Sequence, residues 1–281
     1  MYKKSLNENS KYLIPFVEGV KYYGSDNIEH NLGTMMVINK NGDILTCKHI
    51  ASEFVANLEL GKTYKSIMDE MDNVKNHQER KMIEKKYELN DESVVLSNIN
   101  LPFQVNGDIE INIKVHKYLD IALINFKGIK FDIDTFPTFS TKLPLQGQSV
   151  CKLGYAFPEY DFFEYSESQR NIVMKKDIIA NFPLFPLDGI VTRHVMDENK
   201  KISMFETSTP GIGGQSGGPI FDPQGLVYGM QSMTKYMKLP VNLINKDDKF
   251  DINPYMSLGV GVSSVEIIKF LEENNIKFNK Q

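Results

Sequence analysis

Short stretches in which hydrophobic and polar residues alternate, separated by glycine and proline, run through most of this 281-residue chain. Alternation places successive side chains on opposite faces of an extended backbone, so each stretch predicts a strand with one buried face. Asn41-Gly42 predicts a tight hairpin between two of them. Many short strands with turns between them favour antiparallel barrels over a parallel sheet. The expected strands cover residues 11–23, 33–40, 43–48, 109–115, 120–126, 148–154, 187–195, 202–208, 218–222, 225–234 and 257–262.

Three segments have helical spacing instead. Residues 51–60 predict a short helical turn, and residues 62–90 place apolar side chains at helical intervals among Lys, Glu and Asp. A helix is foreign to a β-barrel, so residues 62–90 are interpreted as an insertion that acts as a lid or docking element. A solvated helical loop without a specific role is the alternative. Residues 263–275 predict a closing amphipathic helix, capped by Ser263 with Glu266 three positions on.

Composition and charge exclude several classes of protein. Hydrophobic residues make up 41% and charged residues 24% of the chain, which is typical of a soluble protein of one large domain or two halves with a shared core. A net charge of −4 provides no basic surface for nucleic acid. No apolar stretch has the length of a membrane span or a signal peptide. We therefore expect neither a nucleic-acid nor a membrane partner, and a bacterial cytoplasmic location, with leaderless secretion into a host as the alternative.

Cysteine and histidine positions predict neither a metal site nor a cofactor. Cys47 and Cys151 are the only cysteines, so at most one disulfide could form. Cys47 stands two residues before His49, which permits a redox role, although a small buried side chain is the favoured interpretation. The five histidines are scattered and show no metal-binding spacing. His116 and His194 are interpreted as hydrogen-bonded or surface residues.

The segment Gly-Gly-Gln-Ser-Gly-Gly-Pro-Ile, residues 213–220, surrounds Ser216 with glycines. Little side-chain bulk then blocks the serine hydroxyl or the neighbouring backbone N–H groups. A nucleophilic serine needs this openness, because the substrate carbonyl must approach closely and donors must meet the oxyanion that forms. Taken alone, such a segment is more often a glycine-rich turn whose serine bonds its own backbone than an active site.

Two upstream segments complete a candidate catalytic triad. An apolar strand leads into His49, and Asp120 stands at the start of another apolar strand. The chain order His49, Asp120, Ser216 is that of chymotrypsin-type enzymes. Ser216 would attack a carbonyl, His49 would take its proton, and Asp120 would orient the imidazole. The backbone N–H groups of Gly214 and Ser216 would form the oxyanion hole.

These segments resemble the trypsin-like serine peptidase family, in particular its bacterial branch without disulfides, the HtrA-type and glutamyl-endopeptidase-like enzymes. The resemblance runs from about residue 33 to residue 270 and rests on several separate motifs in the family's order. Besides the serine segment, the matching motifs are Thr46-Cys47-Lys48-His49, Asp120-Ile121-Ala122-Leu123, Gly154-Tyr155-Ala156-Phe157-Pro158, Gly189-Ile190-Val191 and Gly225-Leu226-Val227-Tyr228-Gly229-Met230.

The resemblance implies an all-β fold of two six-stranded antiparallel barrels in one peptidase domain over residues 1–281. It implies an N-terminal barrel at about 11–127, a C-terminal barrel at about 145–262, and free thiols at Cys47 and Cys151, one in each barrel. Gln215 stands where digestive relatives carry the aspartate that pairs with a freed N-terminus, so activation by that cleavage is not expected. The implied activity is that of a serine endopeptidase without a cofactor.

The family layout also implies which residues bind substrate. Pro210 stands where trypsin carries an aspartate, so a basic substrate side chain before the cleaved bond has no counter-charge. The neutral amide of Gln231 favours small, polar or medium apolar side chains at that substrate position. We expect gating by the insertion or by a regulatory protein. A non-catalytic binding module and an esterase with the same triad remain the alternatives. The expected substrate-binding residues are Pro210, Gly211, Gln231, Ser232, Gly259 and Gly261.

Overall fold

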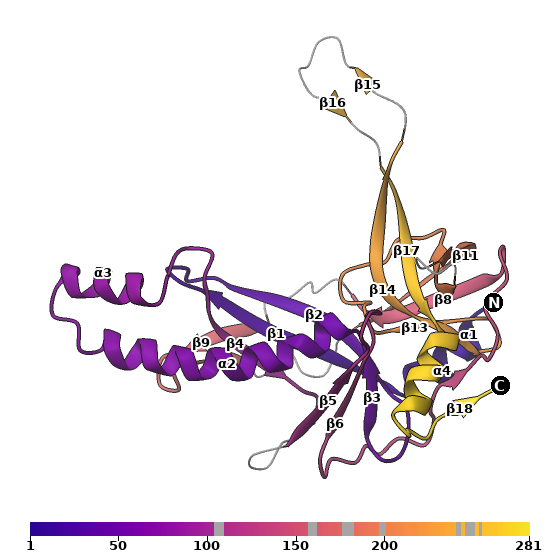
Figure 1. Ribbon diagram of the computed structural model, residues 1–281, viewed down its shortest axis with the longest axis horizontal. Coiled ribbons are helices and arrows are strands. Elements are labelled where there is room, and N and C mark those ends of the chain that lie inside the picture. The colour runs from indigo at the N-terminus through magenta and orange to yellow at the C-terminus, as the bar shows by residue number, and fades with distance from the viewer. Residues whose placement is uncertain are drawn as a thin grey trace.

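A computed structural model describes residues 1–103, 110–156, 162–175, 183–196, 201–239, 243–244, 251–252 and 255–281. The protein is mostly β, and its two large sheets, a curled half-barrel and a closed barrel, are consistent with the trypsin-like double-barrel fold that the resemblance implies. One sheet comes from the first half of the chain and the other from the second half (Figure 1). Part of the Gly154–Pro158 motif and part of the aromatic segment 158–186 lie outside the described residues.

The first sheet has six antiparallel strands in the order β4-β1-β2-β3-β6-β5. The expected hairpin at Asn41-Gly42 is present between β2 and β3, and Gly42 adopts φ +82°, which a side chain would strain. Strand β4 was not predicted. The strands are β1 (Leu13–Tyr22), β2 (Ile28–Val37), β3 (Asp43–Thr46), β4 (Val94–Asn100), β5 (Ile111–Val115) and β6 (Ala122–Phe126).

The second sheet closes into a barrel, because β13 pairs with both β8 and β14. Six strands complete the ring, and two short strands continue the sheet beyond β14. The long β14–β17 hairpin projects from the body in Figure 1. The strands are β7 (Thr138–Phe139), β8 (Ser149–Tyr155), β11 (Leu184–Met196), β12 (Ile202–Thr207), β13 (Pro219–Phe221), β14 (Val227–Lys238), β17 (Tyr255–Ser263) and β18 (Asn279–Lys280); β15 (Leu243–Ile244) and β16 (Asp251–Ile252) pair separately.

Helices are present in the predicted regions, but one boundary was wrong. Instead of a short turn at 51–60 and a separate helix, α2 (Lys48–Met71) continues unbroken from the histidine into the insertion, and α3 (His77–Lys86) follows it. Gly61 lies at an exposed position in the middle of α2, and the helix continues through it. The remaining described helices are α4 (Ser264–Glu273), capped by Ser263 as predicted, and α1 (Lys3–Ser10), which was not predicted.

The aromatic segment before β11 is partly packed against the first sheet. Strands β9 (Phe163–Ser166) and β10 (Asn171–Met174) form a hairpin. Phe162, Phe163 and Ile172 are buried in a cluster that includes Tyr64 of α2. The hydroxyl of Tyr64 also lies 2.9 Å from that of Tyr165. This hairpin therefore attaches the second half of the chain to the outer part of α2.

The main hydrophobic core extends across both barrels. It contains buried residues of β1, β2, β3 and β6 together with residues of β8, β13, β14, β17 and α4. The two sheets are thus joined by apolar packing rather than by a linker alone. Among the helices of the described residues, none combines the length and apolar character needed to cross a membrane.

Candidate active site

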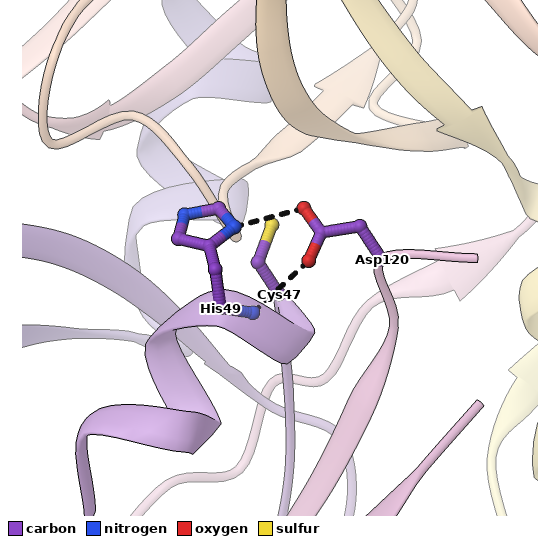
Figure 2. Close-up of side chains that lie close together, drawn as sticks. All are labelled: Cys47, His49 and Asp120. Atoms are coloured by element: carbon purple, nitrogen blue, oxygen red, sulfur yellow. Dashed lines mark hydrogen bonds and ion pairs between the residues drawn. The ribbon is translucent and has the colours of Figure 1, made fainter. Parts of the chain in front are cut away.

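His49 and Asp120 form a hydrogen-bonded pair at the edge of the first barrel. His49 lies in the first turn of α2, and Asp120 lies just before β6. The Nδ1 atom of His49 is 2.9 Å from Oδ2 of Asp120, and the backbone N–H of His49 donates to Oδ1 at 3.1 Å (Figure 2). Ser232 Oγ donates to Oδ2 at 2.6 Å. Three donors from two elements therefore fix the carboxylate.

This pairing keeps the carboxylate charged and the imidazole basic. Burial raises the pKa of Asp120, but the hydrogen bonds from His49 and Ser232 outweigh it and lower the pKa to about 2. The hydrogen bond to Asp120 raises the pKa of His49 above its usual value, against the effect of burial. About half of the His49 side chain is exposed, whereas Asp120 is largely covered. The open face of the imidazole is therefore available to a substrate.

Ser216 lies in the turn before β13, where backbone hydrogen bonds hold it against the first barrel. Its carbonyl accepts from the N–H of Thr34 at 2.8 Å. Its Oγ donates to the carbonyl of Ser232 at 3.2 Å. Within the described part of the chain, no hydrogen bond joins Ser216 Oγ to His49. Ser232 thus contacts both Asp120, through its hydroxyl, and Ser216, through its carbonyl.

The two predicted oxyanion-hole donors are unpaired. Among the described residues, no acceptor receives the backbone N–H of Gly214 or that of Ser216. The Gly214 carbonyl accepts from Thr34 Oγ1 at 2.7 Å, which fixes the turn from the opposite side. Gly214 adopts φ +94°, and a Cβ there would lie 1.9 Å from the carbonyl oxygen of Tyr155. Only glycine fits this turn without moving it.

A buried lysine lies beside the predicted wall of the specificity pocket. Lys152 points into the second barrel and is 1% exposed. Its Nζ donates to the carbonyls of Thr209 and Pro210, both at 2.6 Å, and to Thr207 Oγ1 at 3.2 Å. Burial lowers the pKa of Lys152 from 10.5 to about 7. Among the described residues, no carboxylate forms an ion pair with it.

The other predicted substrate-binding residues are distributed around this wall. A Cβ on Gly211 would lie 2.2 Å from Nε2 of Gln231, so loop and side chain are in tight contact. A Cβ on Gly259 would lie 2.7 Å from Lys152 Nζ. Gly261 instead faces the side chain of Ile220 inside the second barrel. Gln231 is buried, and its Oε1 has no hydrogen-bond partner in the described region.

Thr34 and Lys152 are site residues that sequence reasoning missed. Neither belongs to a motif, because Thr34 contacts the serine turn and Lys152 contacts Thr209 and Pro210 only in the folded protein. Thr46 could have been found, since it begins the motif that contains His49, and its hydroxyl donates to the Thr34 carbonyl at 2.9 Å. His116 accepts from the backbone N–H of Leu119 at 2.8 Å, which fits a structural histidine.

A double barrel with a histidine–aspartate pair beside a serine in a glycine-rich turn defines the chymotrypsin-type class of fold and site. Residues 33–230 match the family described as the trypsin-like peptidase domain. The chain therefore belongs to the trypsin-like peptidase family.

No curated protein matches the chain at a significant level. A crystal structure of the serine endoprotease from Yersinia pestis is similar, with a TM-score of 0.49 and 14% identity over 97% of this chain. The match covers 66% of the Yersinia pestis protein, so this chain spans just under two thirds of its length.

Proposed function

We propose that this protein is a serine endopeptidase that hydrolyses peptide bonds with His49, Asp120 and Ser216. The observation that carries the proposal is that the backbone N–H groups of Gly214 and Ser216, on either side of Gln215 in the serine turn, have no acceptor among the described residues. Buried backbone donors normally find acceptors, so two neighbouring donors without one suit an anionic ligand. Membership of the trypsin-like peptidase family supports the same conclusion.

The reaction begins when Ser216 Oγ leaves the Ser232 carbonyl and donates its hydrogen bond to Nε2 of His49. Such hydrogen bonds commonly tighten only when substrate binds. Ser216 then attacks the substrate carbonyl as His49 takes its proton, and the oxyanion accepts from the N–H groups of Gly214 and Ser216. His49 passes the proton to the leaving amine, and water releases the acyl group by the same steps. Asp120 stays ionised throughout, because its low pKa keeps it a carboxylate next to the imidazolium.

The proposed specificity pocket excludes basic side chains. The family layout puts Pro210 at the base of the pocket, and the Lys152 ammonium is bonded directly to the Pro210 carbonyl. A lysine or arginine entering this space would be buried beside Lys152 with no carboxylate to offset its charge. Small, polar or medium apolar side chains carry no such penalty, and we propose them as the preferred residues before the cut.

We also propose that the helical insertion or a regulatory protein gates the activity. Helix α2 begins beside the active site with His49 and ends in the insertion at Met71, so it joins the two regions directly. A cavity of about 710 Å³ lies between this helix and the β1–β2 turn. Its wall includes Tyr64, Ile67 and Met68 of α2 and Tyr22 and Tyr23 of β1 and the adjoining turn.

A fluorophosphonate probe tests the proposal, because it reacts with an activated serine without any knowledge of the natural substrate. We expect one adduct on Ser216, located by intact mass and peptide mapping, and its loss in Ser216→Ala and His49→Ala. A peptide library and a matched ester series then separate peptidase from esterase activity. Absence of any adduct would favour the latent or non-catalytic scaffold, in which Ser216 stays bonded to Ser232 as observed here.

A further inference from the structure

Cys47 lies against His49 and Asp120 but has no part in the proposed reaction. It occupies the N-cap position of α2, is fully buried, and its thiol donates to the Gln231 carbonyl at 3.3 Å. The Cys47 sulfur, a ring nitrogen of His49 and a carboxylate oxygen of Asp120 all lie within 4.8 Å of one another. Figure 2 shows the sulfur beside the contact between the imidazole and the carboxylate. A thiol, an imidazole and a carboxylate, three groups that can bind a metal ion, therefore lie close together.

This donor set suits one class of metal ion. Thiolate, imidazole and carboxylate together are the ligands of Zn²⁺, which binds them at about 2.0–2.3 Å in a tetrahedron. Ligand atoms in such a tetrahedron are roughly 3.3–3.8 Å apart, so the three groups need to shift by no more than about 1 Å. We propose that Cys47, His49 and Asp120 bind Zn²⁺ and that the bound ion switches off the peptidase. The inhibitory part rests on the proposed function.

Charge and hydrogen bonding support the site. A thiolate and a carboxylate carry two negative charges, which the two positive charges of Zn²⁺ cancel in a largely buried place. Ser232 Oγ, already 2.6 Å from Asp120 Oδ2, would hold the carboxylate in its coordinating position. Among the described residues, Cys151, the other cysteine, has no comparable set of ligands around it. A water molecule would complete the coordination from the exposed side of His49.

The proton balance explains why the bound ion would block catalysis. Coordination through Nδ1 requires the proton that now bridges to Asp120 to move to Nε2, while the Cys47 thiol releases its proton to solvent. One proton is therefore released for each ion bound. The Nε2–H that results can donate a hydrogen bond but cannot accept the Ser216 proton. The general base is lost without any movement of the serine turn.

Cobalt(II) provides a direct test, because a thiolate bound to Co²⁺ gives a charge-transfer absorption in the near ultraviolet. The metal-free protein is titrated with Co²⁺, and the fluorophosphonate labelling rate is measured with and without equimolar Zn²⁺, followed by a chelator. We expect the absorption band, release of one proton per ion, and labelling that stops with Zn²⁺ and returns with the chelator. The same series is run on Cys47→Ser and on the matched control Cys151→Ser, with circular dichroism to confirm that each variant folds.

The proposal predicts that Cys47→Ser loses the band and that its sensitivity to Zn²⁺ falls by at least about 100-fold, since even groups behind the ligands contribute 10–100-fold to affinity. Cys151→Ser should keep both properties. No thiolate band in the wild type, or equal Zn²⁺ inhibition of Cys47→Ser, would overturn it. A band in a protein that the probe never labels would support the metal site and refute the peptidase proposal, so the two failures are distinguishable.

Discussion

Thr34 links the serine turn of the second barrel to the first barrel through one hydroxyl. Its Oγ1 donates to the Gly214 carbonyl and accepts from the Tyr155 N–H at 3.0 Å. Thr34→Val keeps the shape of the side chain but removes its hydrogen bonds to the Gly214 carbonyl and the Tyr155 N–H. We expect stability to fall by about 1–3 kcal/mol and the labelling rate of Ser216 to fall by about 10- to 100-fold, because the oxyanion donors lose their alignment.

The labelling rate and a urea titration measure these two effects of Thr34→Val. Thr141→Val is the control, since the exposed Thr141 hydroxyl also bonds a carbonyl but lies outside the serine turn. A Thr34→Val protein that is labelled at the wild-type rate would show that the turn holds its shape without this hydroxyl.

Lys152 makes stability depend on pH in a direction opposite to that of most lysines. Its pKa is about 7 in the folded protein, against 10.5 when exposed. Between these values the unfolded chain binds a proton that the folded protein does not, so stability rises as pH increases from 7 towards 10.5. The expected slope is about 1.4 kcal/mol of unfolding free energy per pH unit. Urea titrations from pH 6 to pH 9 should show this slope in the wild type, and it should vanish in Lys152→Met.

The exposed lysine of β5 supplies the control for that experiment. Lys114→Met removes a positive charge from an exposed strand position, so its stability curve should keep the wild-type slope. Identical slopes in Lys152→Met and the wild type would mean that Lys152 stays charged in the folded protein, held by the carbonyls of Thr209 and Pro210.

At the scale of elements, alternation and turn residues predicted most strands, because alternate side chains of a strand point to opposite faces and the apolar ones mark the buried face. The β2–β3 hairpin and the α4 cap were found for this reason. Strand β4 was missed because its polar Ser97 faces a buried glutamate: Ser97 Oγ donates to Glu18 at 2.5 Å. The length of α2 was also missed, since nothing in the local sequence distinguishes a turn that stops near residue 60 from one that continues.

In the candidate site too, local sequence motifs predicted some residues, whereas others depend on contacts that only the fold creates. Motifs located His49, Asp120 and Ser216, and the structure brings His49 and Asp120 into contact. Lys152 is buried, although a lysine in a strand normally indicates a position exposed to solvent. Its burial depends on the closed second barrel and is not visible in the sequence of the strand. Cys47 was correctly expected to be a buried free thiol, but its nearness to Asp120 depends on pairing between β3 and β6.

Helix α3 offers the sharpest test of gating. It buries no residue of its own, and its end is attached to α2 through Glu70, which accepts from Lys86 at 2.6 Å and Tyr87 at 2.7 Å. Replacing residues 73–88 with a Gly-Ser linker of equal length removes α3 but keeps the buried Tyr64 and Ile67 of α2. If the insertion gates activity, the labelling rate of Ser216 or the binding of a regulatory protein should change, because α2 runs from this attachment to His49. Unchanged labelling and unchanged binding in a folded variant would contradict gating and would mean that α3 is a solvated helical segment without a specific role.

At the scale of the whole molecule, the two barrels share one core and one site. Residues of β2 and β6 pack in the same cluster as residues of β8, β13 and α4, and the Thr34 hydroxyl joins the barrels next to Gly214. Neither barrel can lose its structure without exposing apolar surface of the other. We therefore expect a single calorimetric transition. Tyrosine fluorescence and far-ultraviolet circular dichroism should change together across it. Two separated transitions would contradict this, and would mean that each barrel is stable alone and that the active site forms only when they associate.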